Sequence, residues 1–450
     1  MSESGTESLS PQTAPKRRGP LRYIPRQISL RTAALIGTLL CSYFAYESIH
    51  IRRSQVHKRA IDLLHSTKDT MVATKDSVPW TPWNYRTYHR YQQKLGRTDV
   101  PFFMELPRVS DIGVFKEKLG MGDERLECIY DLPQSADDAF LDNMHIEELT
   151  TLLLVDLRGT KVTTASMEKL RSLHRLRYLY LDDTVIGDGA IPVLQSCTNL
   201  EVVSAQRAGI TDKSLAAFSE LRQLRDLVIS GNSGITPSGL KTCLSQLQDL
   251  YSLQVSGIPL GDDAFSALPD LQDLSFLDAS DTGVSDGVLP SIGAAGEDLA
   301  LLYLRNNHIT GEGLDSLQGN TQLWGVDLSG NPINEAGVKH LAHMPNLKNL
   351  SLNHVPVTPE MLQALEQCEM LDSLELRHSP GVTDATVRIV VQYPSLQRLD
   401  ITGTQVTAEG IRYLCEHADH LECIILERSR ITDEQEDELL EKTKVHFSRR

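Results

Sequence analysis

The sequence predicts an α/β fold: a right-handed solenoid with a curved parallel sheet on its concave face and helices on its convex face, preceded by a single transmembrane helix. Two observations predict this arrangement. The pattern Leu-x-x-Leu-x-Leu, with Val, Ile or Ala at some positions, recurs in twelve units from about residue 149, at spacings of 24 to 26 residues. One apolar segment, residues 32–51, lies near the N-terminus between basic residues.

Composition and charge exclude several classes of protein. The 450 residues are 40% hydrophobic and 23% charged, which excludes a disordered chain, a collagen and a polytopic membrane protein. The formal net charge is −16, yet residues 1–60 carry ten Lys or Arg and three Glu, a balance of +7 that leaves −23 for the rest. An acidic body argues against a nucleic-acid partner, because phosphate contacts need surplus cations. The seven cysteines are scattered, so neither a disulfide scaffold nor structural zinc is predicted.

The first 51 residues read as a basic tail and a membrane span. Residues 1–31 are rich in Ser, Pro, Lys and Arg, and we expect them to be disordered. Residues 32–51 contain no Lys or Arg, and twenty helical residues rise about 30 Å, the thickness of the hydrocarbon core. A buried helix or a signal-peptide core is the alternative. More basic residues precede the segment than follow it closely, which favours a cytoplasmic N-terminus.

Residues 52–148 are expected to form a linker and an N-terminal capping region. An aromatic stretch at residues 80–91 either packs against the following array or binds a partner. Residues 136–150 have the spacing of a short amphipathic helix, which we expect to cover the first exposed edge of the array.

The repeats occupy residues 149–447. In each unit the second and third apolar residues lie two apart, so they point to the same side of a short strand. A Thr, Ser or Asp then precedes a Leu-bearing stretch, as in Thr211-Asp212 and Thr407, and is expected to cap a helix by accepting free N–H groups. One strand and one helix cannot bury their own apolar side, so neighbouring units must stabilise each other. Residues 445–447 are expected to add a closing strand.

This pattern resembles the leucine-rich-repeat superfamily, and the likeness covers residues 149–447. The presence of Cys three residues before the first Leu, at Cys197 and Cys368, is similar to the helix-containing, cysteine-tolerant type found in ribonuclease-inhibitor-like arrays. The order of basic tail, span, linker and repeats resembles that of bacterial membrane-anchored leucine-rich-repeat proteins. The resemblance implies recognition of a protein partner by the concave face.

Two groups of concave residues form the candidate partner-binding site. The N-terminal patch lies in one unit, and the central patch spans three successive units. Aromatic and Arg side chains surrounded by acids are typical of protein interfaces, although a solvated sheet face also carries such residues. The N-terminal patch consists of Tyr178, Tyr180 and Asp182, and the central patch of Phe276, Asp278, Tyr303, Arg305 and Asp327.

We expect no catalytic site, no cofactor and no metal. His340 and His343 are interpreted as surface histidines, as are His417 and His420 beside Cys415, because no second set of ligands accompanies them. The sequence therefore predicts a membrane-anchored interaction protein with a protein partner. A soluble adaptor and an enzyme regulator or inhibitor of the ribonuclease-inhibitor kind are the alternatives.

Overall fold

The computed structural model describes residues 71–74, 126–130, 132–427 and 445–449. All of them belong to the unit Ser54–Arg450. The expected basic tail, the expected span at residues 32–51 and the aromatic stretch at 80–91 lie outside the described residues. Among those that are described, no helix has the length and apolar character needed to cross a bilayer.

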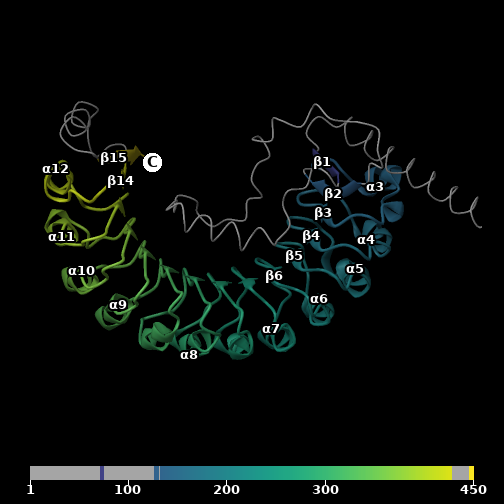
Figure 1. Cartoon of the computed structure of the whole chain (residues 1–450), viewed down its shortest axis with the longest axis horizontal. Coiled ribbons are helices and arrows are strands. Elements are labelled where there is room, and N and C mark those ends of the chain that lie inside the picture. Colours follow the sequence, from purple (N-terminus) through teal and green to yellow (C-terminus); the bar gives the residue numbers. More distant parts are fainter. Residues whose placement is uncertain (1–70, 75–125, 131, 428–444, 450) are drawn as a thin grey trace, which may run out of the picture. The chain divides into compact units, whose positions relative to one another are not determined.

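Fifteen short strands of the described residues form one sheet in chain order (Figure 1). The first two strands pair antiparallel, and every later pairing is parallel. The strands are β1 Met71–Thr74, β2 Leu126–Tyr130, β3 Leu154–Asp156, β4 Tyr178–Tyr180, β5 Val202–Ser204, β6 Asp226–Val228, β7 Ser252–Gln254, β8 Phe276–Asp278, β9 Leu301–Tyr303, β10 Gly325–Asp327, β11 Asn349–Ser351, β12 Ser373–Glu375, β13 Arg398–Asp400, β14 Cys423–Leu426 and β15 His446–Arg449.

A helix or a 3-10 segment follows most strands, and Figure 1 shows these segments along the outer side of the array. The α-helices are α3 Asp138–Met144, α4 Thr164–Leu170, α5 Ile191–Ser196, α6 Asp212–Phe218, α7 Pro237–Leu244, α8 Leu289–Gly293, α9 Glu335–Ala342, α10 Pro359–Leu365, α11 Asp384–Val390 and α12 Ala408–His417. The 3-10 segments are η2 Ile146–Glu148, η3 Gly187–Ala190, η4 Asp262–Phe265, η5 Leu268–Asp270, η6 Asp286–Val288 and η7 Leu314–Gly319. This array of parallel strands and outer helices is a solenoid, as the sequence predicted.

The core lies between the sheet and the helices and runs through the whole array as one cluster. Leu302 at the centre of β9 and Leu304 just after it are fully buried, whereas Tyr303 between them faces the other way. Val155 of β3 and Leu157 just after it belong to the same core. Period-two geometry thus sends one set of side chains to the core and leaves the other on the concave face.

Hydrogen bonds between successive units fix the helix starts. Thr236 caps α7 by accepting the Gly239 N–H, and its own N–H and hydroxyl donate to Asp212 in the preceding helix, at 2.8 and 2.6 Å. Thr407 makes the same pair of bonds to Asp384, at 2.8 and 2.6 Å. The expectation that Thr caps these helices is confirmed, whereas Asp212 and Asp384 bind the Thr of the next unit.

Buried asparagines hold the turns that follow the strands. The amide of Asn307 donates to the carbonyls of Ala279 and Leu304, at 2.9 and 3.0 Å, and its oxygen accepts the Gly283 N–H at 2.8 Å. Because a buried amide satisfies backbone groups of two units at once, it fixes the register of β8 against β9. That register positions the central patch.

Two features differ from the prediction. The expected helix within 136–150 is present as α3, seven residues long, and it buries Leu141 and Met144 in the main core, but the sheet edge at β3 is paired with β2. In the middle units 3-10 segments replace the expected helices. Gly313, which precedes η7, has a φ of +102°, and a Cβ on Gly311 would lie 2.4 Å from Gly337 Cα, so the backbones approach closely at this point. The closing strand, expected at 445–447, is present as β15.

Candidate binding surface on the concave face

The expected site residues lie on or directly after strands β4, β8, β9 and β10. Tyr178 and Tyr180 belong to β4, and Tyr303 belongs to β9, two strands of the same sheet that are separated by four others. With strands about 4.8 Å apart, β4 lies roughly 20 Å along the sheet from β8, the nearest strand of the central patch. The structure therefore places two separate surfaces on the concave face, and they differ in character.

The N-terminal patch is engaged in contacts within the chain. Tyr178, Tyr180 and Val202 form an apolar cluster separate from the main core, and each is at most 8% exposed. Arg158 lies with its guanidinium carbon 5.2 Å from the Tyr180 ring centroid, a cation–π distance, and its Nη2 is 2.6 Å from Asp156. The patch thus packs as a small second core on the sheet.

Asp182 is also held by neighbours. Its Oδ1 accepts the Ser204 hydroxyl at 2.5 Å and the Gln206 N–H at 2.7 Å. Burial raises the pKa of Asp182, although these hydrogen bonds and Arg158 favour the carboxylate. A cavity of about 440 Å³ adjoins this carboxylate, and Arg158 and Arg207 also line it. Both arginines are paired within the chain, Arg158 with Asp156 and Arg207 with Asp183.

The central patch has a different arrangement. Tyr303 lies in register between two carboxylates, Asp278 on β8 and Asp327 on β10. Arg305 Nε is 2.6 Å from Asp327 Oδ2, and 41% of the Arg305 side chain is exposed. Its guanidinium carbon lies 5.3 Å from the centroid of the Tyr303 ring. Phe276 meets the same ring edge to face, with centroids 5.3 Å apart and an interplanar angle of 81°.

Burial dominates the electrostatics of the central patch. It raises the pKa of Asp278 and of Asp327, while Arg305 and hydrogen bonds from Ser280 and Ser329 favour the ionised forms. It also raises the pKa of Tyr303 to about 12, so that this hydroxyl stays neutral at physiological pH. The patch therefore combines a neutral aromatic pair, one guanidinium and two partly desolvated carboxyl groups.

Sequence reasoning missed a third group, around Arg377. Its Nε lies 2.6 Å from Asp400 Oδ2 on β13, and its Nη2 lies 3.2 Å from Glu375 Oε2 on β12. Asn353 donates to the same Glu375 oxygen at 3.0 Å. Each of these residues occupies a position of the repeat that the sequence places on the concave face. The bonds depend on side-chain direction across strands, which no spacing encodes.

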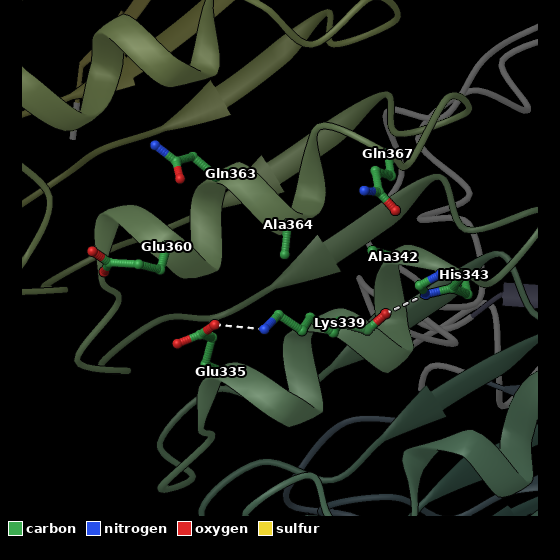
Figure 2. Close-up of a pocket in the computed structure, with 8 residues that line it drawn as sticks. All are labelled: Glu335, Lys339, Ala342, His343, Glu360, Gln363, Ala364 and Gln367. Atoms are coloured by element: carbon green, nitrogen blue, oxygen red, sulfur yellow. Dashed lines mark hydrogen bonds and ion pairs between the residues drawn. The ribbon is translucent and has the colours of Figure 1, made fainter.

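The convex helices carry a shallow cavity of about 490 Å³ between α9 and α10 (Figure 2). Lys339 and Glu335 pair at 2.6 Å along one wall, and His343 Nδ1 lies 2.6 Å from the Lys339 carbonyl oxygen. Ala342 and Ala364 also line it. On α12, the ring of His417 stacks on Tyr413 with centroids 4.0 Å apart. Within the described part of the chain, no group of three His, Cys, Asp or Glu is placed to hold a metal ion.

Comparisons with known proteins agree with this geometry. A family model described as Leucine Rich repeat matches residues 394–415, which span β13 and most of α12. An internalin (inlF) from Listeria monocytogenes matches with 20% identity and a TM-score of 0.50, covering 66% of this chain and 86% of the other. The yeast structure of Rad7 and Elc1 in complex matches with 14% identity and a TM-score of 0.50, covering 94% of this chain and 98% of the other. At these identities the likeness concerns the fold.

Proposed function

Because the chain has a leucine-rich-repeat fold, we propose that it is an interaction scaffold that binds a partner protein through the central patch of its concave face. The observation that carries the proposal is the contrast between the two patches. The N-terminal patch buries its aromatic rings among its own neighbours, whereas the central patch leaves Tyr303 and Arg305 partly exposed.

The rigidity of the surface supports the same proposal. Tyr303 is fixed by β-pairing on both sides and by the ring of Phe276, and Arg305 is held by Asp327. A partner that meets side chains already held in place loses less conformational entropy on binding. Aromatic and Arg side chains at the centre of a surface are also the residue types that contribute most to protein interfaces. The Rad7 structure, which is a complex with another protein, is consistent with such a role.

Affinity purification with matched variants tests the proposal. The test variant is Tyr303→Ala/Arg305→Ala. The control is Tyr413→Ala/Arg388→Ala, because these residues form an equivalent cation–π pair on α11 and α12, with the guanidinium 4.0 Å from the ring centroid. We expect to find proteins that co-purify with the control variant and do not co-purify with the test variant. Equal recovery by both variants would contradict binding at the central patch.

We further propose that residues 32–51 anchor the chain as a single-pass helix with a cytoplasmic N-terminus. The support is the sequence: twenty residues without Lys or Arg, with basic residues on both sides. Extraction of membranes with alkaline carbonate tests the anchor, since an integral chain stays in the pellet and a soluble adaptor is released. An epitope tag at residue 1 that external protease removes from intact cells would contradict the orientation.

A further inference from the structure

The two carboxylates beside Tyr303, those of Asp278 and Asp327, have different partners. Asp327 forms an ion pair with Arg305. Asp278 accepts the Ser280 N–H at 3.0 Å, and no Lys or Arg of the described residues lies within ion-pair distance of it. Both carboxyl groups are neighbours of Tyr303 in register, one on each side. The same ring is therefore flanked by one paired and one unpaired aspartate.

The paired side shows which chemistry this surface accommodates. There a guanidinium contacts a carboxylate at 2.6 Å and also lies 5.3 Å from the ring centroid. A cation gains from both contacts, through attraction between opposite charges and through the quadrupole of the ring. The Asp278 side offers the same two elements, a carboxylate and the partly exposed ring of Tyr303, which the buried Phe276 contacts edge to face.

The charge of the surrounding concave face also favours a cation. Across the concave positions of β6 to β10, the charged residues are Asp226, Asp278 and Asp327 against Arg305 alone. Burial raises the pKa of Asp226 to about 7, so a nearby cation would also stabilise its ionised form. Three carboxyl groups against one guanidinium favour a positively charged partner segment.

We infer that the central patch recognises a basic side chain of its protein partner, an Arg or Lys that pairs with Asp278 and packs against Tyr303. This inference rests on the proposed function, because it names the chemistry of the partner at the same surface. Arg fits better than Lys, since its planar guanidinium pairs with a carboxylate and stacks on a ring at once.

The test uses peptides selected from a random display library on the immobilised full chain in detergent. Binding is then measured by fluorescence polarisation for the chain and its variants. The inference expects the selected peptides to contain an Arg or Lys. Asp278→Asn in the chain should weaken binding about tenfold, and so should replacing the basic residue of the peptide, Arg by citrulline or Lys by norleucine. The two changes together should weaken binding little further. Asp263→Asn on η4 is the control, because it removes the same charge from an exposed residue of the convex side.

The outcomes separate the two proposals. Peptides that lose affinity with Tyr303→Ala but not with Asp278→Asn would overturn the cation inference and leave concave binding intact. Peptides that tolerate both variants, or a library that yields no binder sensitive to either, would overturn both.

Discussion

Thr211 donates both its backbone N–H and its hydroxyl to the carboxylate of Asp188 in the preceding repeat, at 2.9 and 2.7 Å. Ser214 adds a third hydrogen bond to the same carboxylate at 2.7 Å. Thr211 in turn accepts the Lys213 N–H at the start of α6. One aspartate therefore connects the cap of a helix to the unit before it, and it is part of the stability of the array.

The first prediction concerns this aspartate. Asp188→Ala leaves the Thr211 N–H and hydroxyl without their acceptor, so we expect the free energy of unfolding to fall by about 1–3 kcal/mol. Denaturant titration followed by circular dichroism measures the change. Asp263→Ala, an exposed residue with no such bonds, should change it by less than about 0.5 kcal/mol. Equal effects of the two substitutions would show that the bonds between units contribute nothing.

The second prediction concerns pH and Asp226. Burial raises the pKa of this carboxyl to about 7, above its ordinary value of 3.8, with a hydrogen bond from Ser252 and the charge of Arg225 opposing the rise and Glu201 adding to it. Between about pH 4 and 7 the folded state keeps the Asp226 proton that the unfolded state has lost. The free energy of unfolding is therefore undiminished by this group at low pH and falls as pH rises from about 4 to 7. Asp226→Asn should therefore raise the melting temperature at pH 8 and leave it unchanged near pH 3.5. A gain of the same size at both pH values would contradict the assignment.

The third prediction separates the two sides of β9. Leu302 is fully buried, whereas Tyr303 faces the concave side and is partly exposed. We expect Leu302→Ala to lower the free energy of unfolding by about 2–5 kcal/mol. Tyr303→Ala removes a surface contact and should cost about 1 kcal/mol. Urea titration of both variants checks the order, and a larger cost for Tyr303→Ala would mean that the strand faces are assigned the wrong way round.

The fourth prediction concerns Gly311. Its φ is +98°, and an added Cβ would lie 2.4 Å from Gly337 Cα in the next unit. Gly311→Ala should therefore lower the melting temperature through both backbone strain and a steric clash. Gly319→Ala is the control, because a Cβ there meets no atom within 4 Å. Equal melting temperatures for the two variants would contradict the close packing of these units.

The sequence was sufficient for the repeats and insufficient for the site. Val155 and Leu157, Leu302 and Leu304, and their equivalents identify the buried face because leucine spacing follows strand geometry directly. The β2 pairing was missed because residues 126–130 lie before the regular repeat, and a single strand leaves no periodic signal. The 3-10 segments were not predicted, because the spacing of apolar residues does not distinguish them from short α-helices.

The residues of the concave face could be identified from their equivalent positions in successive repeats, but their roles could not be predicted. Tyr180 and Tyr303 occupy the same position of the repeat, yet one packs into a local cluster and the other stays partly exposed. Their neighbours differ: Tyr178 and Val202 pack with Tyr180, whereas Tyr303 has a carboxylate in register on each side, and Arg305 reaches across to Asp327 in the next unit. Such pairings require knowledge of side-chain direction as well as register.

Hydrogen–deuterium exchange of the full chain with and without its purified partner tests the central claim most directly. We predict slower exchange on partner binding in segments that contain β8, β9 and β10, with no change in α9 and α10 on the convex side. Slower exchange confined to the convex helices, with the three strands unaffected, would contradict recognition by the concave face.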